Sequence, residues 1–170
     1  MRFEKSKSDI EIENRNEQFC SNVSEYKANM FRLAKSILHN DTTAEDAVSE
    51  AILKAYTKLH TLRDMQSFKP WIMKILVNES YILSNRRKKI LYLNEIEIAE
   101  EAACYEDKEI WNIVKGMGEE FRIVTILFYH EDLSMKEICK ILDLPLGTVK
   151  SRLSRARSKL KEMLADEGSL

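Results

Sequence analysis

The chain has 170 residues, a formal net charge of −1 and 44% hydrophobic residues, which suits one or two small domains. Its four glycines, two prolines and mostly helical hydrophobic spacing predict an all-α fold. Because no hydrophobic run approaches the roughly 20 residues of a membrane span, and residues 1–16 carry no signal region, we expect a cytoplasmic protein without membrane insertion.

Cysteine and histidine residues are few and dispersed, which argues against a disulfide framework or a zinc site. Carboxylates are plentiful, but none is grouped with histidine or cysteine at ligand spacing, and no glycine-rich phosphate loop occurs. We therefore expect no metal, no cofactor and no enzymatic activity.

A first helical unit is predicted at residues 17–90. Its first helix should run from Phe19 to Leu38. Thr42 and Glu45 have capping-box spacing and should start a second helix that reaches about Leu59. Residues 60–68 should form a loop, and Pro70 suits the first turn of a long helix that reaches residues 86–89.

The second of these helices has an unusual exposed side. Its buried face is predicted to contain Ala47, Val48, Ala51, Ile52, Ala55 and Leu59. Opposite that face, Leu53 lies among three polar residues, Asp46, Ser49 and Glu50. A single exposed leucine needs no explanation, but a hydrophobic centre ringed by acidic groups also resembles a protein-binding spot. Pattern alone leaves both interpretations open.

The third helix brings aromatic residues close to cations. The residues concerned are Phe68, Trp71, Lys74, Asn78, Arg86 and Arg87. Aromatic rings can stack on unpaired bases while cations hold the backbone. Alternatively, Phe68 and Trp71 belong to the core, and the cations only complement the negative end of the helix dipole.

An acidic linker is predicted at residues 91–107, because residues 94–107 carry six carboxylates and no cation. A second helical unit should follow at residues 108–165, with helices at 108–114 and 119–129. Within it, the segment 134–161 holds eight cations against two anions. Such a concentration on a nearly neutral chain indicates a surface for a polyanion.

The segment 134–161 has helix-turn-helix spacing. Ser134 and Glu137 form a predicted capping box, and Pro145 can open the second helix. On that helix a hydrophobic stripe of Val149, Leu153, Ala156 and Leu160 should be buried.

Opposite that stripe lies a polar strip of Gly147, Ser151, Ser154, Arg155 and Ser158. Basic rows flank it, with Lys150, Arg157 and Lys161 on one side and Thr148, Arg152 and Lys159 on the other. This pattern predicts a helix that reads a DNA major groove, and the alternative of a solvated charged helix fits a single-sign surface poorly.

Three segments together resemble bacterial RNA polymerase sigma factors of the extracytoplasmic-function group, in the sigma-70 family. They are DAVSEAILKAY at 46–56, SFKPWIMKILVNESYILSNRRKK at 67–89 and LPLGTVKSRLSRARSKL at 144–160. The resemblance covers about residues 20–163. It implies sigma domain 2 at 17–90, the acidic linker, and sigma domain 4 with its helix-turn-helix at 108–165.

The resemblance also implies a function and partners. The chain would be an alternative sigma factor that binds core RNA polymerase and directs promoter-specific initiation at −10 and −35 elements of promoter DNA. It would contact the β′ clamp helices and the β flap, and it would have an anti-sigma factor. The implied clamp contacts are Asp46, Ser49, Glu50 and Leu53; the −10 contacts are Phe68, Trp71, Lys74, Asn78, Arg86 and Arg87; the −35 contacts are Thr148, Lys150, Ser151, Arg152, Ser154, Arg155, Arg157 and Lys159.

The chain departs from the usual family pattern at Ser49, Ile52, Ile82 and Asp143. Glutamine, phenylalanine, aspartate and glycine are common at these positions, so the changes bear on core contact, −10 base choice and the turn. A stand-alone helix-turn-helix regulator is the main alternative, but it leaves residues 43–59 and 67–89 unexplained. An enzyme such as a nuclease or metal hydrolase lacks a recognisable catalytic cluster.

Overall fold

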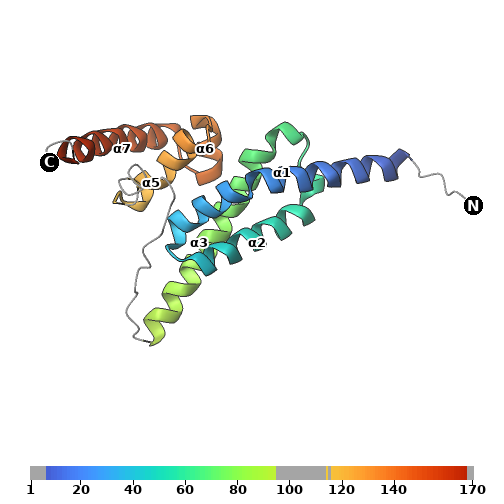
Figure 1. Cartoon of the computed structure of the whole chain (residues 1–170), viewed down its shortest axis with the longest axis horizontal. Coiled ribbons are helices and arrows are strands. Elements are labelled where there is room, and N and C mark those ends of the chain that lie inside the picture. The colour runs from blue at the N-terminus through green and yellow to red at the C-terminus, as the bar shows by residue number, and fades with distance from the viewer. Residues whose placement is uncertain (1–6, 95–113, 115, 168–170) are drawn as a thin grey trace, which may run out of the picture.

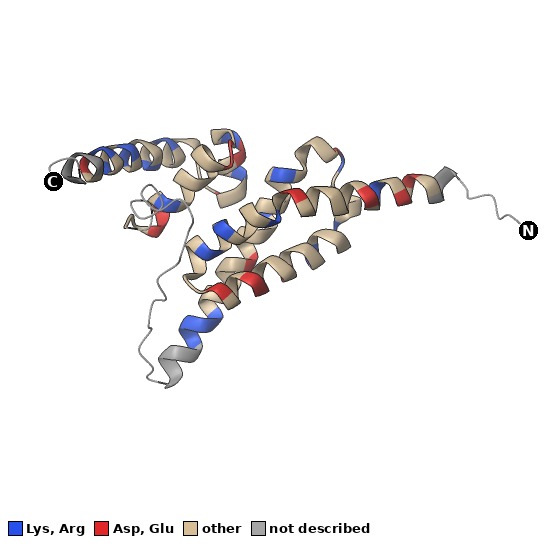
Figure 2. Ribbon diagram, in the orientation of Figure 1, with Lys and Arg blue, Asp and Glu red and all other residues tan. Residues whose placement is uncertain are grey.

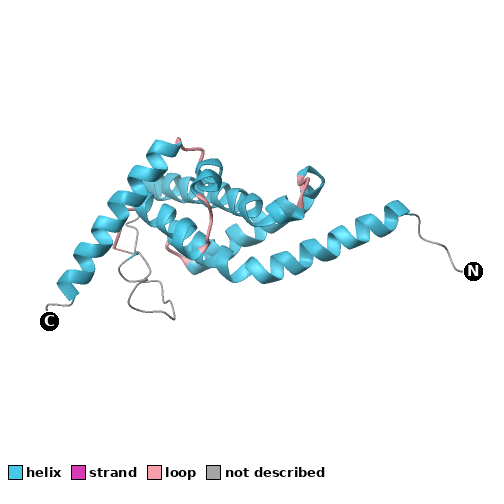
Figure 3. Ribbon diagram, turned by 90° about the horizontal axis from the view of Figure 1, so that it is seen from above, coloured by secondary structure: helices cyan, strands magenta, loops and turns pink. Residues whose placement is uncertain are grey.

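The structure is a computed structural model that describes residues 7–94, 114 and 116–167. Across these residues the regular structure is entirely helical, as Figure 3 shows. The predicted all-α fold is therefore confirmed. None of the described helices is long and hydrophobic enough to cross a bilayer.

The first unit consists of three helices, α1 (Lys7–Leu38), α2 (Asp41–Thr57) and α3 (Phe68–Asn94), and each contacts the other two. In Figure 1, α2 runs beside α1 and α3 crosses both. The buried side chains between them are mostly aliphatic and include Met30, Leu33, Ala47, Ala51, Ile72 and Leu76. The ion pair of Lys54 with the buried carboxylate of Glu79, at 2.5 Å, also joins α2 to α3.

Helix α1 begins at Lys7, well before the predicted start at Phe19. Its first turns project beyond the rest of the unit (Figure 1). The guanidinium of Arg15 donates hydrogen bonds to the backbone oxygens of Leu59 and Leu62, the first at 2.9 Å, and so anchors this extension. Hydrophobic spacing does not predict the extension, because residues 7–18 are nearly all polar.

Helix α2 is capped by Asn40, so the predicted capping box of Thr42 and Glu45 is wrong. The Asn40 side-chain oxygen accepts hydrogen bonds from the Thr43 backbone N–H at 2.9 Å and from the Thr43 hydroxyl at 2.6 Å. Asparagine is at least as favourable as threonine at the N-cap position of a helix. His39, at φ 55°, reverses the chain just before the cap, which places Asn40 at the first position able to satisfy the helix.

The predicted loop at 60–68 is folded into two short 3₁₀ turns, η1 (Leu59–Thr61) and η2 (Met65–Ser67). Buried Leu59 and Leu62 hold the first turn, and Asp64 accepts a hydrogen bond from the Gln66 N–H at 2.9 Å in the second. Helix α3 then starts with Pro70 in its first turn, as predicted.

The second unit contains α5 (Glu119–Thr125), a π-helical turn η3 (Ile126–His130), α6 (Met135–Leu142) and α7 (Leu146–Glu167). The predicted helix at 119–129 thus exists, but its last turn widens into the π form. The acidic linker predicted at 91–107 overlaps the end of α3 as far as Asn94, and the remainder lies outside the described residues. The helix predicted at 108–114 lies outside them too, except for Val114.

The two units pack against each other rather than standing apart. Helix α6 lies against α3, and α5 contacts α1 (Figure 1). The hydrophobic core runs from one unit into the other. Side chains on the facing surfaces of α3 and the second unit are therefore not all exposed to solvent.

Candidate functional site

The helix-turn-helix is built by local signals that the sequence carries. Ser134 Oγ accepts a hydrogen bond from the Glu137 N–H at 3.3 Å, and the Ser134 N–H donates to Glu137 Oε2 at 2.7 Å. The predicted capping box is therefore confirmed. Asp143 ends α6 in the left-handed region at φ 52° and ψ 43°, and the Leu144 N–H donates to the Cys139 oxygen at 3.0 Å. Asp143 thus takes the conformation for which a turn glycine is usual.

Helix α7 buries its predicted hydrophobic stripe, with Leu160 only partly buried, and exposes the opposite strip. Val149, Leu153 and Ala156 are fully buried. Ser151, Ser154 and Arg155 are exposed on the other side, and basic residues follow the helix along its length (Figure 2). The face geometry expected from periodicity is therefore present, with a single arginine between small polar groups.

The two basic rows beside this strip differ in the structure. Lys150 and Arg157 are exposed to solvent. On the other side, Arg152 pairs with Glu120 at 3.1 Å, and Lys159 Nζ lies 4.9 Å from the centre of the Phe121 ring. Arg152 and Lys159 therefore help to attach α7 to α5, a role that the sequence did not reveal. Thr148, in the same row, is partly buried.

The residues predicted to contact a −10 element are distributed differently along α3. Phe68 is only 1% exposed and packs against Phe19 and Tyr26, with ring centroids at 5.7 and 6.3 Å. Its prediction as a DNA contact is corrected here, because a core ring cannot stack on a base. Trp71 is partly buried beside Phe68, at 5.8 Å.

Further along α3 the polar residues reach the surface. Asn78 and Arg86 are exposed and Arg87 is partly buried. Lys74 instead pairs with Asp143 Oδ1 at 2.8 Å, across the boundary between the two units. A cation expected to grip DNA is therefore already occupied by a carboxylate.

The polar patch on α2 has the geometry expected of a docking surface. Asp46, Ser49 and Glu50 are exposed, and Leu53 is 59% exposed among them. Tyr56, which sequence reasoning did not single out, extends the hydrophobic centre by one turn and is also exposed. Its spacing of three residues from Leu53 on a helix is a signal that could have found it.

A polar network that the sequence did not predict joins the two units. The Glu131 carboxylate is fully buried and accepts a hydrogen bond from Asn29 Nδ2 at 2.9 Å. Lys69 Nζ lies 3.1 Å from Glu131 Oε2 and donates to the Glu131 backbone oxygen at 2.6 Å. His130 Nδ1 lies 2.9 Å from Glu131 Oε1. Burial and the nearby carboxylates of Glu25 and Glu131 raise the pKa of Tyr26, which borders this network.

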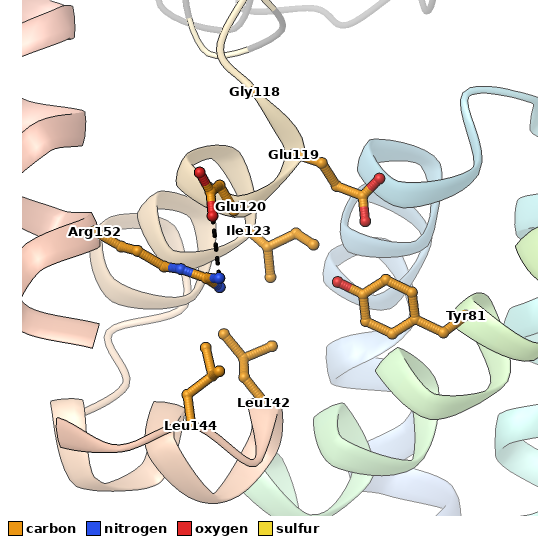
Figure 4. A pocket seen from close by; sticks show the side chains of 8 residues that line it. All are labelled: Tyr81, Gly118, Glu119, Glu120, Ile123, Leu142, Leu144 and Arg152. Atoms are coloured by element: carbon orange, nitrogen blue, oxygen red, sulfur yellow. Dashed lines mark ion pairs between the residues drawn. The ribbon is translucent and has the colours of Figure 1, made fainter. Parts of the chain in front are cut away.

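A cavity of about 730 Å³ lies between α3, the start of α5 and the α6–α7 turn (Figure 4). The Arg152–Glu120 ion pair forms one wall of the cavity. Tyr81 and Glu119, which face each other, form the opposite wall. Burial, and then the Glu119 carboxylate to which the Tyr81 hydroxyl donates a hydrogen bond, raise the pKa of Tyr81 to about 12. Within the described part of the chain, no three histidine, cysteine or acidic residues are grouped to hold a metal.

Comparisons with known proteins agree with both units. The family model of sigma-70 region 2 matches residues 23–89, and that of sigma-70 region 4 matches residues 109–160. The RNA polymerase sigma factor SigV of Bacillus subtilis is 30% identical over 149 residues, covering 85% of this chain and 90% of the relative. The ECF RNA polymerase sigma factor SigW of the same organism is 29% identical over 167 residues, covering 87% and 89%.

Among solved structures, the sigma factor RpoE of Bartonella quintana in complex with the anti-sigma factor NepR has a TM-score of 0.78. It is 24% identical, and the match covers 86% of this chain and 96% of that one, which shows a shared fold. The region 2 match includes residues 43–59 and 67–89, the segments that a stand-alone helix-turn-helix regulator leaves unexplained. That alternative is therefore not favoured.

Proposed function

Because the chain belongs to the extracytoplasmic-function group of RNA polymerase sigma factors, we propose that its surfaces divide promoter recognition into separate contacts. As an alternative sigma factor, it directs transcription from specific promoters. We infer that it does so in the cytoplasm, with no cofactor and no catalytic activity of its own. This division is supported by one observation: a single chain contains both sigma regions and has an exposed polar strip on α7.

In the proposed −35 contact, α7 enters the major groove. Arg155, with Ser151 and Ser154, would meet base edges, while Lys150 and Arg157 would meet phosphates. Arg152 and Lys159 would assist mainly by holding α7 against α5, since their side chains already contact that helix. Thr148 would lie at the edge of this contact.

In the proposed −10 contact, α3 follows the non-template strand. Asn78, Arg86 and Arg87 would meet the DNA backbone, and the partly buried Trp71 is the aromatic residue near enough to the surface to support a base. Lys74 would join them once its pairing with Asp143 is broken.

The α2 patch would dock core polymerase. Leu53 supplies the hydrophobic centre, and Asp46, Ser49 and Glu50 supply its polar border, which fits the β′ clamp helices. The second unit would touch the β flap. One solved neighbour is a sigma factor bound to the anti-sigma factor NepR, and we propose an anti-sigma partner here as well.

The energetics explain why polymerase is needed. Opening DNA costs about 1–2 kcal/mol per stacked step, and each base captured on an aromatic surface returns about 1–3 kcal/mol. Two small contacts leave little surplus unless polymerase holds them at a fixed separation and raises their effective concentration. The isolated chain should therefore bind promoter duplexes weakly.

Selection from a random duplex library tests this division. With core polymerase and the chain together, the enriched sequences should contain two elements at a constant spacing. The chain alone should enrich neither element strongly. Strong enrichment of one element by the chain alone would favour an ordinary DNA-binding regulator and contradict the proposal.

A further inference from the structure

Two lysines near the start of α3 meet carboxylates of the second unit. Lys69 Nζ is 3.1 Å from Glu131 Oε2, and Lys74 Nζ is 2.8 Å from Asp143 Oδ1. Two turns beyond Lys74, the Tyr81 hydroxyl donates to Glu119. Each of these contacts joins α3 to an acidic residue that lies more than thirty-five positions later in the chain.

The Glu131 contact is specific rather than incidental. Its side chain is fully buried, and Asn29, Lys69 and His130 all lie within 3.1 Å of its oxygens. A buried carboxylate is tolerated only when cations and hydrogen-bond donors surround it. Of these three residues, Asn29 and Lys69 belong to the first unit and therefore form a socket on it for an anionic oxygen, whereas His130 belongs to the second unit and moves with Glu131.

The Asp143 contact is exposed, and its position is informative. The Asp143 side chain is 72% exposed and the Lys74 side chain is 39% exposed. Asp143 occupies the α6–α7 turn, and its pairing brings that turn onto the surface of α3 that would follow single-stranded DNA. A DNA strand along α3 would have to displace the turn.

Carboxylate and phosphate oxygens compete for the same lysine ammonium groups, because both are anionic hydrogen-bond acceptors. We propose that Glu131 and Asp143 occupy phosphate-binding positions on α3, so that packing of the second unit and binding of single-stranded DNA exclude each other. The proposal rests on the proposed function of α3. It adds Lys69 to the DNA-binding residues and makes the packed form an autoinhibited state of the free chain.

The test uses the full chain without polymerase and a fluorescein-labelled single strand of 20 deoxythymidines. The double variant E131Q/D143N removes both carboxylates and keeps the side-chain shapes, and asparagine tolerates the left-handed backbone of residue 143. The matched control, D132N/E162Q, makes the same change in charge at exposed residues. Asp132 is also left-handed, at φ 53°.

If packing leaves about a tenth of the molecules open, E131Q/D143N should bind the strand on the order of tenfold more tightly than the wild type, because apparent affinity scales with the competent fraction. The control should gain much less. Adding K69Q and K74Q to the first variant should abolish the gain, which distinguishes α3 from the basic face of α7. Equal affinity of E131Q/D143N and the control overturns the proposal.

A second measurement leaves the buried Glu131 unchanged, so that it still tests the proposal if the E131Q change unfolds the chain. D143N alone changes an exposed side chain, and acetylation read by mass spectrometry should show Lys74 more reactive in D143N than in the wild type, with exposed Lys58 as an internal reference. The single strand should then protect Lys74 in D143N. An unchanged reactivity, or no protection by DNA, contradicts the proposal. Transcription with core polymerase is a separate assay, so loss of the proposed function and loss of this inference give different results.

Discussion

Arg155 is the cation that lies in the middle of the exposed polar strip of α7, between Ser151 and Ser154 on one side and Ser158 on the other. That position separates base readout from backbone contact. Arg155→Ala should cost about 1–3 kcal/mol at particular −35 base pairs and relax preference there. Holoenzyme binding to a set of single-base promoter variants measures the effect.

The matched control for Arg155 is Arg157→Ala, because Arg157 is exposed at the edge of the same helix. Its loss should weaken binding to every sequence alike and reduce the salt dependence by about one counterion. If Arg155→Ala also weakens all sequences equally, the assignment of the faces of α7 is wrong.

Leu53 tests the proposed polymerase surface. Leu53→Asp places a charge at the hydrophobic centre of the α2 patch and should reduce affinity for core polymerase at least tenfold, or about 1.4 kcal/mol. Ile12→Asp is the control, because Ile12 on the α1 extension is 59% exposed, as Leu53 is. Both variants should keep the wild-type circular dichroism spectrum. If the two variants bind core polymerase with equal affinity, the α2 patch is not part of the interface.

Tyr81 gives a pH dependence whose sign follows from its environment. Its pKa is raised from 10.0 to about 12, so the folded chain favours the neutral hydroxyl. This contribution to stability is complete below pH 10 and is lost as the pH rises through about 12. Glu119→Gln should lower the pKa of Tyr81, as measured by absorbance at 295 nm against a Tyr81→Phe reference. A midpoint that does not move would show that Glu119 has no part in the shift.

At the scale of elements, the caps decide where helices begin. Asn40→Ala removes the acceptor for Thr43 and should lower the free energy of unfolding by about 1 kcal/mol, measured by urea denaturation. Thr42→Ala, one position into α2, should change it by less than about 0.5 kcal/mol. If Thr42→Ala instead lowers the free energy of unfolding more than Asn40→Ala does, Thr42 is the cap.

Helix positions were largely predictable where hydrophobic residues repeat. The capping box at Ser134, the buried stripe of α7 and the exposed Leu53 all followed from spacing, because each depends on neighbours within one or two turns. The start of α1 did not, since Arg15 is held by backbone oxygens more than forty residues away. Phe68 was ambiguous for a related reason: an aromatic ring at the start of a helix serves a core or a binding face equally well.

At the scale of the whole molecule, the packing of the two units could not be read from the chain. Lys69 and Glu131 are 62 positions apart, and neither carries a local signal that names its partner. Spacing likewise places Arg152 in a DNA-binding row, whereas the structure pairs it with Glu120. Spacing determines which face of a helix is polar, whereas the partner of a polar face depends on how the helices meet.

The packed arrangement also fits the dependence on polymerase. In the free chain, α3 and the α6–α7 turn face each other, so the two proposed DNA contacts are not arranged to act on one promoter together. Core polymerase would separate the units and hold both contacts in place. This opening of the chain would favour promoter binding in addition to the higher effective concentration of the two contacts.

Transcription in vitro with purified core RNA polymerase on a library of bacterial promoters tests the central claim most directly. The account predicts that adding this chain produces transcripts from a small set of promoters that share −10 and −35 elements, and that Leu53→Asp reduces their yield. If core polymerase with the folded chain starts no specific transcript at any promoter in the library, the account is contradicted.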